Sequence, residues 1–126
     1  MTKGNYVDGF VLVIPKKDVA AYKKLATEAA KTWKRFGALD YKECVGEDLK
    51  PDTGGMPSPL TFTKMAKVKA GETVWFSYIV YKNKKHRDTV NKNVMAYFAK
   101  KYKGKSQDMP FDMKKMAYGG FSVVVQ

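Results

Sequence analysis

Residues 73–81, Thr-Val-Trp-Phe-Ser-Tyr-Ile-Val-Tyr, decide the fold of this chain. The run is rich in β-branched and aromatic residues, which is typical of a β-strand. Its alternate side chains are apolar on both faces, because Val74 and Phe76 oppose Trp75 and Ile79. A strand with one face open to water would instead alternate apolar with polar residues. The stretch therefore predicts a strand that is covered on both faces.

Three further segments are predicted to be strands. Residues 6–14 form an apolar and aromatic run that ends at Pro15. Residues 38–45 follow the same pattern, as do residues 115–125 near the end of the chain. Within the last segment, Gly119-Gly120 predicts a bulge or a close approach of the backbone to another group.

Only two segments have the periodicity of long helices. The first begins at the N-cap Asp18 and ends at Gly37, with apolar residues three or four apart. These are Val19, Tyr22, Leu25, Ala29, Trp33 and Phe36. The second begins after the N-cap Asn83 and runs to about Tyr102. Residues 46–59 are expected to be an irregular loop, and residues 61–68 a short helical turn or an extra strand.

The order of these segments is βαββαβ, which is typical of a ferredoxin-like α+β fold in one domain of residues 1–126. This fold has an antiparallel sheet with two helices on one face. The other face, here called the outer face, carries Val7, Val11 and Val13 of the first strand. Because the chain has no further long helix to cover it, we expect a second copy to do so. Two sheets packed face to face would form a homodimeric α/β barrel.

The composition is that of a globular protein of the cytoplasm. Hydrophobic residues make up 44% of the 126 residues and aromatic residues 13%. The longest apolar run, around residues 11–14, is far shorter than the ~20 residues needed to span a bilayer, so we expect no membrane partner. The first residues lack the pattern of a signal peptide. The single cysteine, Cys44, makes no internal disulfide, which agrees with a reducing compartment.

The net charge of +12 has two interpretations. Lysine and arginine neutralise phosphates, so a nucleic-acid partner is one of them. However, the lysines are spread over the whole length and are concentrated only in residues 82–87 and 100–105. A soluble, lysine-rich surface is the other interpretation, and we favour it. Nucleic-acid binding is therefore expected to be weak.

No motif of a known enzyme mechanism is found in the sequence. His86-Arg87-Asp88 with Asn93 matches the spacing of a protein-kinase catalytic loop, but it falls on a predicted helix. There is no glycine-rich phosphate loop, and a kinase domain needs about twice this length. Neither paired Cys or His at metal spacing nor a nucleophile elbow is present. We therefore predict no metal site and no stored cofactor.

Two titratable residues are the candidates for proton transfer. Asp8 shares a strand face with Tyr6 and Phe10, and a carboxylate in such apolar surroundings has a raised pKa, which suits a general base. The alternative is a structural Asp8 that caps a loop or a strand end. His86 is the only histidine and lies in the first turn of the second helix, which favours its neutral form. A His86 bonded to a strand or to Glu43 is the alternative that we favour.

Several polar and aromatic residues are expected to line a cavity around these two. The candidates for substrate binding are Glu43, Trp75, Ser77, Tyr78 and Tyr118. Pockets for small molecules combine an apolar wall with a few polar groups, and this set offers both. For each aromatic residue taken singly, packing in the core is the more common role.

Segments over nearly the whole chain resemble one known family. They are Tyr6-Val7-Asp8-Gly9-Phe10, Trp33 with Gly37-Ala38-Leu39, Tyr41-Lys42-Glu43-Cys44-Val45, Val74-Trp75-Phe76-Ser77, His86-Arg87-Asp88, and Met109-Pro110-Phe111-Asp112 with Tyr118-Gly119-Gly120-Phe121. Together they resemble the YbaA-like family, domain of unknown function 1428. The resemblance implies the dimeric α/β barrel fold, which cofactor-free monooxygenases, isomerases and haem-degrading enzymes share. It implies no particular reaction. Residues 97–105 depart from the family, whose members carry a shorter Asp-Pro segment there.

Three functions are therefore carried forward from the sequence. The first is the binding or conversion of a small molecule in a cavity of the homodimer, without a stored cofactor. In that case Asp8 or His86 would move the proton. The second is an RNA-binding module that uses the basic surface, although the RNP pattern of RNA-recognition motifs is absent. The third is a purely structural dimer. The sequence leaves open whether the protein is an enzyme.

Overall fold

The computed structural model of the chain describes residues 4–103 and 109–126. This part of the chain is α+β, with a four-stranded antiparallel sheet and three α-helices. The elements in chain order are β1 (Tyr6–Pro15), the 3₁₀ turn η1 (Lys16–Asp18), α1 (Val19–Arg35), β2 (Asp40–Val45), α2 (Phe62–Met65), β3 (Glu72–Tyr81), α3 (Lys84–Lys101), the 3₁₀ turn η2 (Met113–Lys115) and β4 (Ala117–Ser122).

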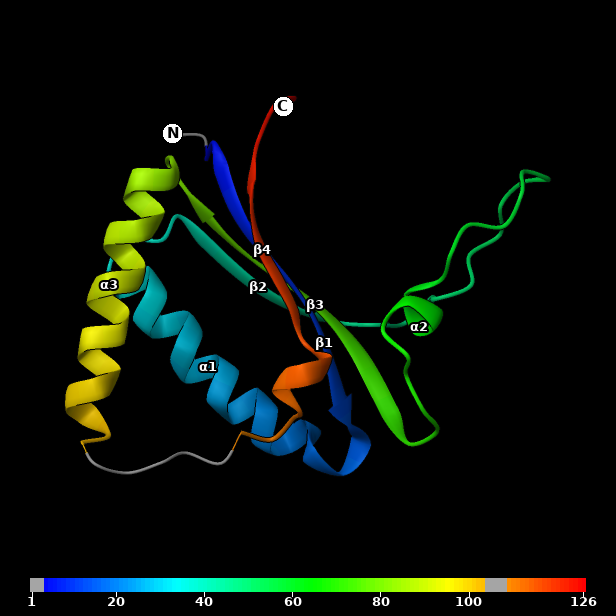
Figure 1. Ribbon diagram of the computed structural model, residues 1–126, viewed down its shortest axis with the longest axis horizontal. Helices are drawn as coiled ribbons and strands as arrows, with labels where there is room; N and C mark the ends of the chain where they lie inside the picture. Colours follow the sequence, from blue (N-terminus) through cyan, green and yellow to red (C-terminus); the bar gives the residue numbers. More distant parts are fainter. Residues whose placement is uncertain (1–3, 104–108) are drawn as a thin grey trace.

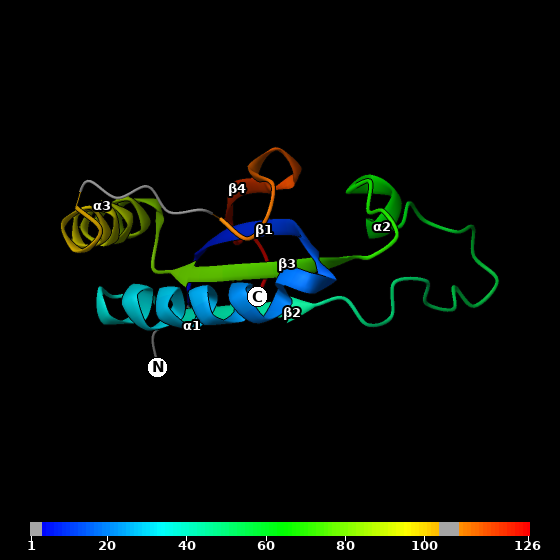
Figure 2. The same ribbon diagram turned by 90° about the horizontal axis from the view of Figure 1, so that it is seen from below.

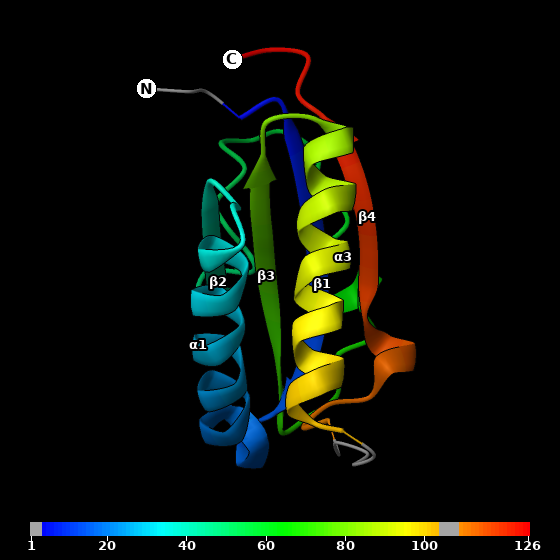
Figure 3. The same ribbon diagram turned by 90° about the vertical axis from the view of Figure 1, so that its left-hand side faces the viewer.

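The strands lie in the order β2-β3-β1-β4, and every neighbouring pair is antiparallel. The central pair, β1 and β3, is aligned from Tyr6 opposite Tyr81 to Pro15 opposite Glu72. The two long helices, α1 and α3, lie on one face of this sheet (Figure 3). The loop that carries α2 projects from the other side, away from α3 (Figure 1, Figure 2).

The alternation of side chains along β1 explains why the helices pack on this face. Tyr6 packs with residues of α3 in one core cluster, which also contains Val90 and Val94. Leu12 packs with residues of α1 in a second cluster, which contains Tyr22 and Ala26. α1 contributes to both clusters, because Trp33 near its end packs against the first one. Phe10 lies between them and contacts both clusters.

The predicted helices are confirmed, although their ends differ in detail. Asn83 caps α3, since its side-chain oxygen accepts a hydrogen bond from the His86 N–H at 2.8 Å. Asp18 makes no such side-chain hydrogen bond, because it belongs to the 3₁₀ turn that leads into α1. Gly37 follows α1 with a φ of +117°, a conformation that favours glycine.

Two ambiguous segments take definite forms in the structure. The segment at residues 61–68 contains a single helical turn, α2, capped by Thr61, and it contains no extra strand. β4 is shorter than predicted, and its pairing with β1 advances one residue at a time through Gly119 and Gly120, so there is no bulge. A side chain at Gly120 would instead meet the hydroxyl of Tyr6 and the guanidinium of Arg87. The predicted close approach is therefore present there.

The outer face of the sheet is only partly covered in the single chain. At one end Val74 is buried, beside Leu49 and Phe62 of the loop that carries α2. Further along, Phe76 is 47% exposed and Phe121 is 62% exposed. The described chain therefore leaves large apolar side chains of this face in contact with water.

No helix in the described part of the chain is both long and apolar enough to cross a membrane.

Candidate functional site

A cavity of about 530 Å³ lies between the sheet and the two long helices. We call it the sheet–helix cavity. It is mostly apolar, and its volume falls in the usual range for small-molecule pockets. Its aromatic wall is formed by Phe10, Tyr22, Trp33, Tyr41, Phe98, Tyr102, Phe111 and Tyr118. Residues of both helices line it, among them Ala29 of α1 and Met95 of α3, above Ser77 of β3.

Asp8 is the most deeply buried polar group in the wall of this cavity. Its side chain is 1% exposed, although it carries a carboxyl group. Tyr118 donates a hydrogen bond of 3.3 Å to its Oδ2. Its Oδ1 has no hydrogen-bond partner among the described residues. Burial raises the pKa of Asp8, and the nearby charge of Arg87 and hydrogen bonding with the side chains of Tyr118, Asn91 and Tyr81 oppose this rise.

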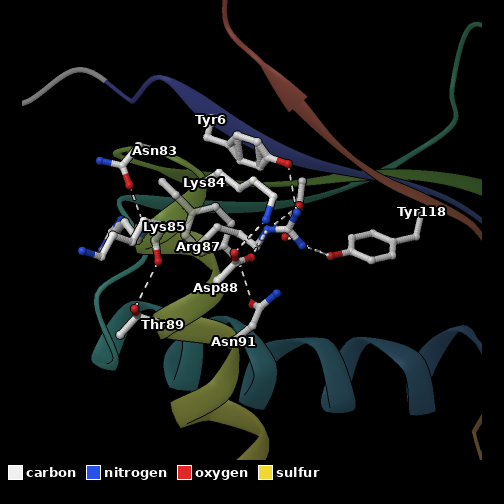
Figure 4. A network of polar contacts seen from close by, with 12 residues as sticks. Tyr6, Asn83, Lys84, Lys85, Arg87, Asp88, Thr89, Asn91 and Tyr118 are labelled. Atoms are coloured by element: carbon white, nitrogen blue, oxygen red, sulfur yellow. Dashed lines mark hydrogen bonds and ion pairs between the residues drawn. The ribbon is translucent and has the colours of Figure 1, made fainter.

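Arg87 links Asp8 to the first turn of α3, and Figure 4 shows its side chain between Tyr6 and Tyr118. Its guanidinium donates hydrogen bonds to the hydroxyls of Tyr6, at 2.9 Å, and Tyr118, at 3.0 Å. Its Nε lies 3.7 Å from Asp8 Oδ1, which is too far for a hydrogen bond, and 3.3 Å from Asp88 Oδ1. The Arg87 guanidinium therefore forms ion pairs with both Asp8 and Asp88. It also donates a hydrogen bond to the Tyr118 hydroxyl, which in turn donates to Asp8.

Asn91 connects the helices and the sheet on the same side of the cavity. Its Oδ1 accepts a hydrogen bond of 3.0 Å from the Trp33 indole and one of 3.1 Å from the Tyr81 hydroxyl. Because Asn91 lies four residues after Arg87 on α3, both side chains point to the same side of the helix. This i, i+4 pair of polar residues is the sequence signal from which both could have been found.

Glu43 forms a second polar centre in the cavity wall. Its carboxylate accepts hydrogen bonds from Tyr22 and Tyr41, both at 2.8 Å, and from Ser77 at 2.6 Å. Within the described part of the chain it takes part in no ion pair. Burial, and next the charge of Glu43, raise the pKa of both tyrosines, so they remain protonated and act as donors.

The structure brings four of the seven candidate residues to the cavity. They are Asp8, Glu43, Ser77 and Tyr118. Tyr78 does not join them, because strand alternation places it on the outer face with Phe76. Trp75 is a core residue, whose indole donates to Thr73 and whose ring packs edge-on against Tyr22.

His86 is also absent from the cavity lining. Its Nδ1 accepts a hydrogen bond of 3.0 Å from the backbone of Lys82, just after β3, and a second bond reaches the backbone of Gly37. Burial, and next the charge of Lys82, lower its pKa. The geometry thus matches the structural alternative for His86, with backbone partners in place of Glu43.

In residues 4–103 and 109–126, no group of three His, Cys, Asp or Glu side chains is arranged to hold a metal ion. The polar groups of the cavity wall are carboxylates, hydroxyls, one amide and the indole N–H of Trp33. This set can hydrogen-bond a ligand and exchange a proton with it through Asp8.

Comparison with known proteins adds a family but no reaction. Residues 5–113 match the model of the family described as protein of unknown function (DUF1428). The chain is 41% identical over 121 residues to the uncharacterized protein YbaA of Escherichia coli (strain K12), and equally to that of Shigella flexneri, covering 95% of this chain and 97% of each relative. A de novo designed protein, Foldit4, covers 95% of this chain and 98% of its own at 12% identity, with a TM-score of 0.41, which is too low to support an argument. On the family match and the identity to YbaA, the chain belongs to the DUF1428 family.

Proposed function

We propose that the protein binds a small, partly aromatic molecule in the sheet–helix cavity. Asp8 would form a hydrogen bond with the reactive or polar end of this molecule. One observation carries this proposal above the others. Asp8 lines a cavity large enough for a ligand, and its buried Oδ1 has no hydrogen-bond partner in the described part of the chain, only the Arg87 Nε at 3.7 Å.

A buried polar atom without a partner is rare in folded proteins and costs about 1–3 kcal/mol. A ligand that donates a hydrogen bond to Asp8 Oδ1 would remove this cost and fix its own orientation. The rings of Phe10 and Tyr118, which stack with their centroids 4.7 Å apart beside Asp8, offer a flat surface for its apolar part.

The same geometry would support proton transfer. A carboxylate whose pKa is raised by burial is a stronger base than one in water. Asp8 would accept a proton from the bound molecule and become a neutral carboxylic acid, and the Tyr118 hydroxyl, held by Arg87, would stabilise the carboxylate before the transfer. This step needs only a donor group on the ligand and no cofactor.

A cavity-filling substitution tests this proposal. Phenethyl alcohol, a neutral probe with an aromatic ring, is titrated against the full chain and followed by saturation-transfer NMR. Ala29 lines the cavity from α1, so Ala29→Phe should abolish binding. Ala21 is exposed on the same helix, so the matched variant Ala21→Phe should bind as the unmodified chain does. Equal binding by both variants, or none by the unmodified chain, would disprove the proposal.

We further propose that the fold is ferredoxin-like and that two copies pair through the outer face as a dimeric α/β barrel. The exposed Phe76 and Phe121 support this, together with exposed apolar residues of the α2 loop such as Leu60, 68% exposed, and Met65, 50% exposed. Four strands spaced ~4.8 Å apart, with eight residues of ~3.4 Å each, give a face of about 500 Å². With the loop, this approaches the ~800 Å² that each partner buries in a standard interface.

A further inference from the structure

The charged residues that line the sheet–helix cavity are all acidic, in a chain with 24 basic and 12 acidic residues. They are Asp8, Glu28 and Glu43, and no described Lys, Arg or His lines the cavity with them. Three charged residues taken at random from this chain would be mainly basic. The cavity thus reverses the sign of the whole molecule, and its wall favours a positively charged ligand.

Glu28 does not contribute to this field. Its Oε1 lies 3.1 Å from the Lys101 ammonium and accepts a hydrogen bond of 2.6 Å from Tyr102. Its side chain is 39% exposed, so water screens the remaining charge. This residue therefore serves as an internal control for an acidic group of the cavity wall that is already neutralised.

Glu43 has no cation partner among the described residues. Its three partners are neutral hydroxyls, two on Oε1 and one on Oε2. Since a carboxylate has about four acceptor positions, one position on Oε2 is left. Lys23 of α1 borders a separate pocket that Glu43 also touches, but the two form no ion pair.

Aromatic rings surround this uncompensated carboxylate. Tyr22 and Tyr41 bond it directly, and the Trp33 ring lies 6.1 Å from that of Tyr41. The faces of such rings attract cations and repel anions. A carboxylate among aromatic rings is the arrangement by which proteins bind organic ammonium groups.

Asp8 lies at the other end of the cavity floor. Its strand, β1, is separated from that of Glu43 by β3, and the pairing of Asp8 with Ile79 and of Glu43 with Ser77 offsets them by two residues. Strand spacing and rise place their Cα atoms about 12 Å apart. Because Asp8 Oδ1 already has the Arg87 Nε at 3.7 Å, it suits a neutral donor better than a second cation.

We propose that the natural ligand of this cavity is an organic amine, whose ammonium group pairs with Glu43 and whose apolar body extends across Phe10 towards Asp8. This inference rests on the proposed function, because it requires that the cavity binds a small molecule. Beyond the proposed function, it specifies that the ligand is positively charged and that Glu43 recognises this charge.

The test compares three probes that share a phenyl ring and a two-carbon chain and differ in the head group. They are phenethylamine, the neutral phenethyl alcohol, and the anionic hydrocinnamate. Titration calorimetry or ligand-observed NMR on the full chain should show phenethylamine binding about tenfold more tightly than the alcohol, as a charge-assisted hydrogen bond predicts. Hydrocinnamate should bind most weakly.

Two matched variants then locate the recognition. Glu43→Gln keeps the shape and removes the charge, so the preference for the amine over the alcohol should disappear while the alcohol still binds. Glu28→Gln removes an acid of the same wall that is already paired with Lys101, and the preference should remain. Binding of the alcohol by each variant shows that its cavity is intact.

The possible results distinguish the amine proposal from the proposal that the cavity binds a small molecule. If the alcohol or hydrocinnamate binds at least as tightly as the amine, or if Glu43→Gln keeps the preference, the amine proposal is wrong while the cavity remains a binding site. If none of the three probes binds, the proposed function itself fails, and the amine proposal fails with it.

Discussion

Replacing Arg87 by methionine should expose the energetic cost of burying Asp8. Methionine keeps much of the length of the side chain and removes its charge and its donors. The substitution leaves the carboxylate of Asp8, 1% exposed, without a cation, and it deprives the Tyr6 and Tyr118 hydroxyls of their donor. Removing one partner of a buried ion pair costs about 3–5 kcal/mol.

The expected loss is smaller than for an ideal buried pair. Arg87 is 17% exposed, and its Nε lies 3.7 Å from Asp8 Oδ1, beyond hydrogen-bond distance. Tyr118 also keeps its hydrogen bond to Asp8. We therefore expect the free energy of unfolding to fall by about 2–3 kcal/mol at neutral pH.

The pH dependence, together with a second substitution at Asp8, identifies Asp8 as the cause. Burial raises the pKa of Asp8 above its ordinary value of 3.8, so the folded protein binds its proton more tightly than the unfolded chain does. Asp8 therefore lowers stability as the pH rises above 3.8, and it has no such effect below that value. Without Arg87 the carboxylate is less favourable still. The difference between Arg87→Met and the unmodified chain should be present at neutral pH and shrink below pH 3.8.

Urea unfolding, followed by circular dichroism at both pH values, measures these differences. Lys84→Met removes an exposed ion pair with Asp88 on the same turn, so it should cost less than ~1 kcal/mol at either pH. Adding Asp8→Asn to Arg87→Met should recover most of the loss. A loss that is equal at both pH values, or that the second substitution does not reduce, would refute the interpretation of Asp8 as a buried, partly compensated charge.

Three further predictions test other parts of the structure. Light scattering at micromolar concentration should give a mass of about 28 kDa, twice 14.2 kDa, and Phe121→Asp should reduce it towards one chain; a monomeric unmodified chain would contradict the dimer. Binding to RNA should be weak and should be lost between low and physiological salt, because it depends on counterion release; tight binding at physiological salt would show that the basic surface is functional. Gly120→Ala should lower the free energy of unfolding by about 1–3 kcal/mol, since its methyl group would meet Tyr6 and Arg87, whereas Gly9→Ala has room and should cost less; equal losses would contradict the close packing.

Most of the fold could be predicted from local patterns. The period of two in residues 73–81 fixes which side chains share a face, and the structure confirms that Phe76 opposes Trp75. The same rule places Tyr78 with Phe76 on the outer face. This position conflicts with the prediction that Tyr78 lines the cavity beside Ser77. For Tyr78, the position in the strand is thus a better guide to the face than the type of side chain.

The polar centres were less accessible to sequence reasoning because their members are distant in the chain. Glu43 receives its hydrogen bonds from Tyr22 and Ser77, which are 21 and 34 residues away. Arg87 reaches Tyr6 over 81 residues. Such contacts depend on how far α1 and α3 stand from each other and from the sheet, which local periodicity does not determine. Asp8 was found because a carboxylate between Tyr6 and Phe10 conflicts with the apolar pattern of its own strand.

The position of the two carboxylates has a consequence for how the fold is stabilised. The core consists of two clusters, one packed by both long helices and one packed by α1, and Asp8 and Glu43 line the cavity between the helices and the sheet. Apolar side chains at both positions would add to the hydrophobic core and would avoid the cost of burying charged groups. In place of them the chain has two carboxylates, supported by Arg87 and by a set of hydroxyls. Local departures from good packing of this kind are expected at sites of function, where the rest of the fold compensates for them.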